Sequence, residues 1–397
     1  MKVLLLAGEE SGVIYAERIR AELADCEIRG YADYGFKTAD LAVMGFWAVL
    51  KKIFFFLRVR RTLKRAIDEW RPDVVCTIDY PGLNLQLAAY AKSRGVRTVH
   101  VVCPQIWAWK KGRIPKIEAS LDRLCCFFPF EPAYFKPGFA EFVGHPLAED
   151  FPSSQSPIPN PQSPIPNPES PIPNPQSRIP NPPLTLALLP GSRMGEIERN
   201  LPTLLEAVAM LAAEFGERLR FVFPAANRLA FDRIASIMRS YRTKAVVYPP
   251  EGVREIKCAV ETKLGGAREV LCRADAAVVA SGTATLEAAL ARCPTVLVYR
   301  VSAALAWFAR RVIKEITHIG LINIVWEKTG AHAAGEEAPM PELIQEAFTP
   351  EAVVKAVKPW LSDAEARKNA VLRLDATVRK LGTTGHAIAR IAELVRG

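Results

Sequence analysis

Short apolar runs, each followed by a turn of small residues and then by a helical pattern, recur along this chain of 397 residues. Residues 3–7 form the first run, Gly8-Glu-Glu-Ser-Gly12 the turn, and residues 14–23 the helical pattern. This order opens a parallel α/β sheet. Strands of such sheets are buried on both faces, so they read as near-continuous apolar runs. The alternation predicts an α/β fold class built from doubly wound sheets.

The alternation stops once and then restarts. In residues 151–183 the unit Ser-Pro-Ile-Pro-Asn-Pro recurs with a period of seven residues. Proline at alternate positions removes backbone donors and blocks both helix and central strand. We therefore expect an extended, polyproline-like linker between two domains. A ligand for proline-recognising domains is the less favoured interpretation.

Two domains of this kind suit the length of the chain. The first domain is expected at residues 1–150 and the second, after the linker, at 184–364. Expected strands of the first domain after residue 7 are 72–79, 98–103, 124–128 and 140–143, with a helix at 83–93. Expected strands of the second are 186–189, 220–224, 245–248, 276–280 and 295–299, with helices at 196–213 and 283–291 and a helical tail at 350–396.

Composition narrows the class of partner. The formal charge of +10 favours an anionic partner, which is nucleic acid, a phosphorylated small molecule or an anionic lipid. No helix-turn-helix, RNP or zinc signature is present, so we expect no nucleic-acid partner. The eight cysteines are scattered without Cys-x-x-Cys spacing, so reduced thiols and no metal are expected. No apolar run approaches the roughly 20 residues of a spanning helix, and the start turns acidic too early for a signal peptide. A cytoplasmic location is expected.

Two turns of the second domain suit a nucleotide. Small and hydroxylated residues between a strand and a helix leave backbone N–H groups at a helix N-terminus, which suits a phosphate, and Glu287 lies where a carboxylate reaches a ribose hydroxyl. The candidate nucleotide-binding residues of this turn are Ser281, Gly282, Thr283, Ala284, Thr285 and Glu287. A plain capping motif, with Thr283 as the cap, is the alternative.

The second turn is Leu189-Pro-Gly-Ser-Arg193. Gly191 allows close backbone approach, and Arg193 offers a planar, always-charged fork for a diphosphate. Ser192 and Glu196 are assigned to the same site. A surface turn with an incidental arginine is the alternative interpretation.

In the first domain, Asp79 follows a predicted strand and precedes Pro81-Gly82. A carboxylate at this edge of a sheet is a candidate general base for a hydroxyl acceptor, or else a cap for the next helix. The acidic first loop, with Glu9, Ser11 and Gly12, favours a sugar hydroxyl or a basic partner over phosphate. It lacks the G-x-G-x-x-G fingerprint of dinucleotide sites.

Residues 51–65 combine three consecutive phenylalanines with seven basic residues in a helical pattern. Successive helical residues differ by about 100° in direction, so at least one phenylalanine should face outward. Basic and aromatic residues on one helix are typical of an interfacial membrane anchor. The candidate membrane-binding residues are Phe54, Phe55, Arg58 and Arg61; a core helix with a solvated basic face is the alternative.

Taken together, these residues resemble the lipid-A-disaccharide synthase family over almost the whole chain outside 151–183. The landmarks that carry the resemblance occur in the same order as in the family: Gly8-Glu9-x-Ser11-Gly12, Leu41-Ala-Val-Met-Gly45, Ile78-Asp79-x-Pro-x-x-Asn84, Pro104-Gln-x-Trp-Ala-Trp109, Pro129-Phe-Glu131, Val143-Gly-His-Pro146, Leu188-Leu-Pro-Gly-Ser-Arg193, Ser281-Gly-Thr-Ala-Thr-Leu-Glu287, Asn323 and Pro341-Glu-Leu-Ile-Gln345.

The resemblance implies a GT-B fold of two facing Rossmann-like domains, with the C-terminal helical segment, about 365–397, returning to the first. It implies inverting, cofactor-free and metal-free transfer of 2,3-diacylglucosamine from UDP to 2,3-diacylglucosamine 1-phosphate, giving the β-1,6-linked lipid A disaccharide 1-phosphate. Asp79 is then the base, Arg193 the diphosphate partner, and Asn323 lines the cleft. The family is peripheral on the anionic inner face of the inner membrane. Whether the chain forms a homodimer is left open.

The chain departs from the family pattern at two places. Position 13 is Val where the family usually has Asp, and residues 326–328 read Trp-Glu-Lys where Gly-Arg is usual. Two rival hypotheses remain: a glycosyltransferase or epimerase on another UDP-sugar, and a non-catalytic lipid- or nucleotide-binding descendant.

Overall fold

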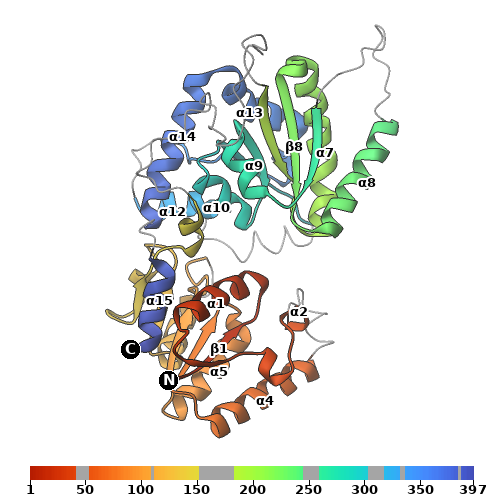
Figure 1. The fold of residues 1–397 in the computed structure, drawn as a ribbon. Coiled ribbons are helices and arrows are strands. Elements are labelled where there is room, and N and C mark those ends of the chain that lie inside the picture. The colour runs from red at the N-terminus through yellow and green to blue at the C-terminus, as the bar shows by residue number, and fades with distance from the viewer. Residues whose placement is uncertain are drawn as a thin grey trace, which may run out of the picture. The chain divides into compact units, whose positions relative to one another are not determined.

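The computed structural model describes residues 1–41, 53–108, 111–151, 183–244, 259–302, 317–330, 336–382 and 386–397 (Figure 1). The described residues form two compact units. Met1–Asp150 and Lys380–Gly397 belong to unit 1, and Phe151–Val312 and Ile316–Arg379 belong to unit 2. Most of the proline-rich segment and the strand expected at 245–248 lie outside the described residues.

Unit 1 contains a six-stranded sheet whose neighbouring strands are all parallel. In spatial order its strands are β2 (Glu27–Arg29), β1 (Lys2–Ala7), β3 (Val74–Ile78), β4 (Arg97–Val101), β5 (Arg123–Cys126) and β6 (Ala140–Phe142). The expected strands are confirmed. β2 was not predicted, because its three residues include no apolar run.

Helices cover both faces of this sheet. On one face lie α1 (Glu10–Glu22) and α15 (Ala387–Arg396); on the other lie α4 (Ile53–Trp70), α5 (Pro81–Ser93) and α6 (Ile114–Ser120), and the short α2 (Thr38–Leu41) contributes to the second face. Alternate residues of β1 enter opposite cores: Val3 and Leu5 pack with α1 and α15, Leu4 and Leu6 with α4 and α5. This is the doubly wound arrangement that the continuous apolar runs predicted.

Helix α15 is distant in sequence from the sheet on which it packs (Figure 1). Ile391 and Val395 are fully buried beside α1 and the strands. The guanidinium of Arg97, at the start of β4, donates to the carbonyl oxygens of Leu394 (2.6 Å) and Val395 (3.1 Å). These are among the last carbonyls of the helix, which have no partner within it, so Arg97 fixes the end of the chain onto unit 1.

Unit 2 contains a second parallel sheet of six strands. The spatial order is β12 (Glu342–Ile344), β11 (Thr295–Tyr299), β10 (Ala276–Ala280), β7 (Leu184–Leu189), β8 (Leu219–Ala225) and β9 (Ala259–Leu264). The edge strands β9 and β12 were not predicted. β9 has Glu, Thr and Lys at its centre and so forms no apolar run, and β12 has only three residues.

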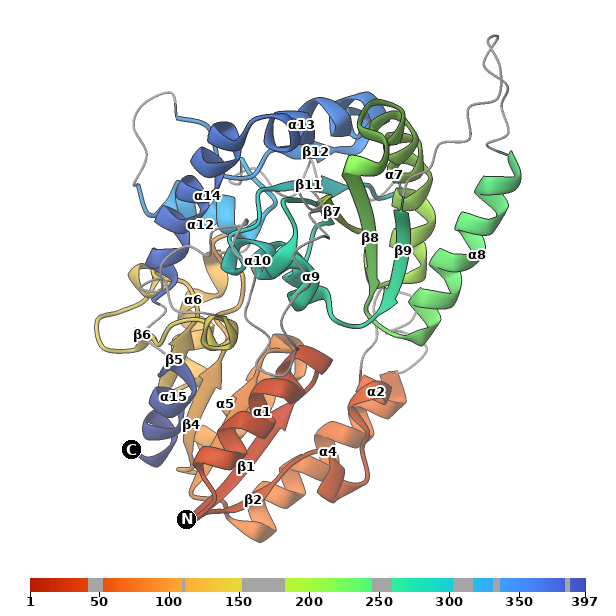
Figure 2. The same ribbon diagram turned by 45° about the horizontal axis from the view of Figure 1, so that its top comes forward.

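One face of this sheet packs on α7 (Met194–Phe215), α8 (Arg228–Lys244) and α13 (Pro350–Ser362). Figure 2 shows α8 running along β9, with α7 beside it. The other elements of unit 2 are α9 (Ala267–Arg273), α10 (Thr283–Leu290), α12 (Leu321–Lys328) and α14 (Ala364–Val378), and α14 contacts both α10 and α12. The helices predicted after β7 and β10 are therefore confirmed.

Within the described part of the chain, no helix combines the length and apolarity needed to cross a membrane.

Docking of α15 generates a stability prediction. Ile391→Ala removes a fully buried side chain from the core of unit 1 and should lower the free energy of unfolding by about 2–5 kcal/mol. Ile14→Ala is the matched control, because Ile14 on α1 is 58% exposed; its effect should stay within about 0.5 kcal/mol. Urea unfolding followed by circular dichroism measures both. Equal effects of the two substitutions would contradict the burial of α15.

Candidate functional site

Asp79 lies at the carboxyl end of β3, directly before α5. Its φ of 49° and that of Tyr80 (52°) are both left-handed. For residues other than glycine, such a conformation costs roughly 1–3 kcal/mol and persists only when the surroundings enforce it. The backbone N–H of Asp79 donates to the carbonyl of Val101 at the end of β4 (2.9 Å). The turn is thereby tied to the neighbouring strand.

The side chain of Asn84 holds the backbone of this turn in place. It is fully buried in α5, and its Nδ2 donates to the carbonyls of Asp79 (2.8 Å), Ile78 (3.1 Å) and Leu6 (3.3 Å). Its Oδ1 accepts from the hydroxyl of buried Tyr31 (2.7 Å). Asn84 was noted only as a landmark in the sequence. The structure gives it a positioning role, since it binds the ends of β1 and β3 together below Asp79.

The Asp79 carboxyl group is half-buried. One oxygen, Oδ1, accepts from the N–H of Tyr80 at 2.7 Å. Burial raises the pKa of Asp79 above its ordinary value, and the hydrogen bond from Tyr80 opposes this only in part. A carboxylate with a raised pKa is a stronger base, so the residue has the electrostatics required for accepting a proton.

The first loop packs directly on the Asp79 turn. A Cβ on Gly8 would lie 2.6 Å from Cγ of Tyr80, so no larger residue fits there. Burial, and secondly the charge of Glu9, raise the pKa of Tyr80. Gly12 is buried beside Ile78, whereas the side chain of Ser11 lies outside what the structure describes. Val13 packs against the apolar core, so this departure from the family pattern has a local packing role.

In unit 2, the turn after β7 is closed on itself by Glu196. Its Oε2 accepts from the N–H groups of Ser192 (3.3 Å) and Arg193 (3.4 Å), and its Oε1 pairs with Arg193 Nη1 (3.0 Å). Gly191 has φ of 126°, and a Cβ there would lie 2.6 Å from Glu196. Asn200, which is buried in α7, donates to the carbonyl of Pro190 (2.8 Å). The Arg193 side chain stays 63% exposed and keeps further N–H donors for an anion.

The turn after β10 has no side chain that caps the following helix, unlike the turn after β7, which Glu196 closes. Gly282 is the N-cap of α10, with φ of 151° and no side-chain cap, so the expected alternative of a Thr283 cap is not what the structure has. The N–H of Ser281 donates to the carbonyl of Val298 (3.0 Å), and the Thr285 hydroxyl donates to the carbonyl of Gly282 (2.7 Å). Thr283 is exposed and Ala284 and Glu287 are half-buried. The backbone amides at the start of α10 therefore face a position suited to an anion.

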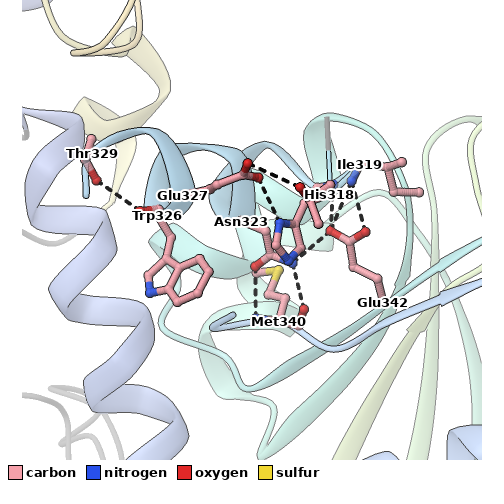
Figure 3. A network of polar contacts seen from close by, with 10 residues as sticks. His318, Ile319, Asn323, Trp326, Glu327, Thr329, Met340 and Glu342 are labelled. Carbon is pink, nitrogen blue, oxygen red and sulfur yellow. Dashed lines mark hydrogen bonds and ion pairs between the residues drawn. The ribbon is translucent and has the colours of Figure 1, made fainter. Parts of the chain in front are cut away.

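Asn323 has its polar atoms engaged within unit 2 (Figure 3). Its Nδ2 donates to the Met340 carbonyl (2.7 Å) and to Glu342 Oε1 (2.8 Å), and its Oδ1 accepts from the Met340 N–H (3.1 Å). Glu342 also accepts from the N–H groups of Ile319 (2.9 Å) and Gly320 (3.0 Å). Because Asn323 is fully buried, this geometry assigns it to holding the start of α12 against β12. Sequence reasoning quoted Glu342 within a motif but gave it no role.

A buried carboxyl group also joins the loops after β4 and β5. Glu131 is 2% exposed and accepts from Trp107 Nε1 (3.1 Å), Phe127 N (3.1 Å) and Phe128 N (3.0 Å). Burial raises its pKa to about 8. Among the described residues, Glu131, Cys103 and Cys126 form the one group of metal-ligating type, with ligand atoms within 4.8 Å of one another. The three N–H donors already satisfy the carboxyl group, so the cluster needs no cation to be stable.

The phenylalanines of the aromatic and basic helix α4 differ in exposure. Phe54 is 82% exposed, with Ile53 and Leu57 partly exposed beside it. Phe55, by contrast, is half-buried and packs edge-on against Phe36, with ring centroids 6.0 Å apart. The expectation that at least one phenylalanine faces outward is confirmed. Arg58 and Arg61 are exposed on the same helix.

Comparison with known proteins adds a decisive observation. A family model described as lipid-A-disaccharide synthetase matches residues 3–392. The chain belongs to this family. A lipid-A-disaccharide synthase from Syntrophus aciditrophicus (strain SB) is 35% identical over 97% of this chain and 94% of its own length. Another from Myxococcus xanthus (strain DK1622) is 35% identical over 99% and 96%. The chain is therefore an enzyme, a glycosyltransferase of lipid A biosynthesis, as the landmarks predicted.

Solved structures that resemble the chain share its fold. A UDP-GlcNAc 2-epimerase from Neisseria meningitidis, bound to UDP-GlcNAc, has a TM-score of 0.57 at 11% identity and covers all of both chains. CalG4, the calicheamicin glycosyltransferase, has a TM-score of 0.52 at 14% identity, covering 99% of this chain and 97% of its own. With the two parallel six-stranded sheets, this likeness confirms the predicted α/β fold class of GT-B type.

The raised pKa of Glu131 generates a prediction for stability. Between its ordinary pKa of about 4.3 and about 8, the folded chain keeps a proton that the unfolded chain has lost, so rising pH lowers the free energy of unfolding by up to about 1.4 kcal/mol per pH unit. Glu131→Gln lacks this proton, and the slope of its unfolding free energy against pH should be flatter over that window. Urea titrations at several pH values measure both slopes. Parallel curves for the two proteins would show that Glu131 titrates normally.

Proposed function

We propose that the chain transfers 2,3-diacylglucosamine from UDP to the 6-hydroxyl of 2,3-diacylglucosamine 1-phosphate, giving the β-1,6-linked disaccharide 1-phosphate. The observation that carries this proposal is Asp79, a half-buried carboxyl group of raised pKa held at a strand end by Asn84. Membership of the family supports the choice of substrates. Solved structures of similar fold include one bound to UDP-GlcNAc and one determined with UDP, which supports a UDP-sugar donor.

Unit 2 is assigned the donor. The exposed guanidinium of Arg193 and the backbone amides at the start of α10 are proposed to neutralise the diphosphate. Glu287 is proposed to accept from the ribose hydroxyls. Glu196 and Asn323 are proposed as positioning residues, because their own hydrogen bonds fix the turn after β7 and the start of α12.

Unit 1 is assigned the acceptor. Asp79 takes the proton of the 6-hydroxyl as that oxygen attacks the anomeric carbon. The bond from this carbon to the diphosphate breaks, and the electron pair leaves on UDP. Glu9, beside Tyr80, is proposed to bind an acceptor hydroxyl together with the loop from Gly8 to Gly12. One displacement inverts the anomeric centre.

The membrane surface is the proposed location of the reaction, at the inner face of the inner membrane. Exposed Phe54, with Ile53 and Leu57, is proposed to enter the interface, while Arg58 and Arg61 meet anionic headgroups. Phe55 packs into unit 1 and is proposed to support the helix rather than to enter lipid. Both substrates carry acyl chains, so their reacting groups lie near such a surface.

The first test is transfer by the purified chain. The wild-type protein should form the disaccharide from UDP-diacylglucosamine and the monosaccharide 1-phosphate, and Asp79→Asn should lower kcat by about 10²–10⁴-fold. Asparagine keeps an oxygen for the Tyr80 N–H and tolerates the left-handed backbone, so the turn should survive. The wild-type kcat should also fall at low pH with a midpoint above the ordinary Asp value of about 3.9, since burial raises the pKa of Asp79.

Asp73→Asn is the matched control, because Asp73 precedes β3 at the opposite end and accepts from the N–H of Lys2 (2.7 Å). It should leave kcat unchanged. Full activity of Asp79→Asn would remove Asp79 as the base. Epimerised UDP-sugar without disaccharide would favour the rival enzyme, and UDP binding without any turnover would favour the non-catalytic rival.

The second test concerns the membrane. Phe54→Ser should weaken sedimentation with phosphatidylglycerol vesicles by about tenfold, equivalent to roughly 1.4 kcal/mol. Leu229→Ser on α8 is the control, because Leu229 is also strongly exposed (64%) but lies in unit 2. Raised salt should weaken binding of the wild-type protein further. Equal losses for the two variants, or none, would reject α4 as the anchor.

A further inference from the structure

We propose that Glu131 is a positioning residue for the transfer: it joins the loops that follow β4 and β5, and through the end of β4 it fixes the backbone of Asp79. The proposal rests on the function proposed above for Asp79. Glu131 and Trp107 belong to landmark motifs that had no assigned role, and the geometry supplies one.

The Glu131 carboxyl group uses each oxygen for a different loop. Oε1 accepts from Trp107 Nε1, which lies in the loop after β4 (3.1 Å). Oε2 accepts from the N–H groups of Phe127 and Phe128, immediately after β5 (3.1 and 3.0 Å). Trp107 and Glu131 are each 2% exposed, so water does not compete for these bonds. The two loops therefore move as one piece.

A short path leads from this junction to Asp79. Val102, between β4 and the Trp107 loop, has φ of 76°, a left-handed value that is a clear outlier for a β-branched residue. Its N–H donates to the carbonyl of Cys125 in β5 (3.1 Å), and the preceding carbonyl, of Val101, accepts from the N–H of Asp79 (2.9 Å). Glu131 ties the loop that follows Val102 to the residues that follow β5, the strand on which the Val102 N–H is bonded. Releasing them lets Val102 relax, which frees the carbonyl that orients Asp79.

Aromatic packing reinforces the same junction. Phe130 stacks on Phe128 with centroids 5.9 Å apart and meets Trp107 edge-on at 5.5 Å. Phe127 packs on His145 at 5.0 Å. Three landmark motifs, around Trp107, Glu131 and His145, thus converge on one cluster inside unit 1. Packing within unit 1 therefore gives all three motifs a common structural role.

Above its pKa of about 8, the Glu131 carboxyl group is ionised, and its two oxygens then accept from the three N–H groups that converge on them. In Glu131→Gln the oxygen serves Phe127 and Phe128, and the amide NH₂ then faces the N–H of Trp107, so two donors oppose each other. Trp107→Phe removes that N–H. The double variant should therefore lose less than the two single losses combined, which a double-mutant cycle measures.

The experiment uses the full chain and two readouts. Glu131→Gln should lower kcat/KM for the acceptor by about tenfold through loss of alignment, with KM for the UDP-sugar unchanged because the donor residues lie in unit 2. Hydrogen exchange at the Asp79 amide should quicken several-fold at the same time. Glu118→Gln is the control, since Glu118 accepts a single backbone N–H, from Lys136 (2.7 Å); it should change neither readout.

Each outcome is decisive. In Glu131→Gln, kcat could fall only in proportion to the loss of folded protein, while hydrogen exchange at the Asp79 amide stays unchanged in the folded fraction. That result would make Glu131 merely structural and would overturn the proposal. Unchanged exchange and unchanged activity would overturn it as well. If the wild-type protein forms no disaccharide, the proposed function fails, yet quickened exchange at Asp79 in Glu131→Gln would still establish the connection between the two residues.

Discussion

The hydrogen bonds from Asn84 to three carbonyls at the ends of β1 and β3 are the constraint on which the proposed acceptor site depends. They hold two consecutive left-handed residues, Asp79 and Tyr80, in a conformation that the free chain would leave. The turn presents the Asp79 carboxyl group at the sheet edge in a half-buried setting that raises its pKa. The same turn thus fixes the position of the Asp79 carboxyl group and provides the burial that raises its pKa. Gly8 completes the arrangement, because only glycine allows the first loop to lie against Tyr80.

At three other places a glutamate side chain holds backbone groups together, as the Asn84 amide does here. Glu196 closes the turn after β7, Glu342 holds the start of α12, and Glu131 joins the loops after β4 and β5. In each case a carboxyl group accepts backbone N–H donors, from a strand-end turn for Glu196 and Glu131 and from the start of a helix for Glu342. The acid fixes its backbone locally, and in the turn after β7 this leaves the exposed guanidinium of Arg193, the group proposed to meet the diphosphate.

Sequence reasoning found most of the described strands, since burial on both faces of a sheet leaves mainly apolar runs in the sequence. It missed β2, β9 and β12, whose short or polar sequences depend on a neighbouring strand for their structure. It placed Asp79 and Arg193 from their positions at strand ends. It did not find the roles of Asn84, Glu131 and Glu342, because each also bonds to a segment far away in the sequence: Leu6, Trp107 and Ile319 respectively. It also treated Phe54 and Phe55 alike, whereas packing on Phe36 turns Phe55 inward.

The configuration of the product tests whether Asp79 acts as a general base in a single displacement. A UDP-sugar donor labelled with carbon-13 at the anomeric carbon would be converted by the wild-type chain, and the coupling of that carbon in the disaccharide read by NMR. We expect an exclusively β-linked product, formed at a rate that depends on Asp79. An α-linked product would require either two displacements or a different catalytic group, and would contradict the role of Asp79.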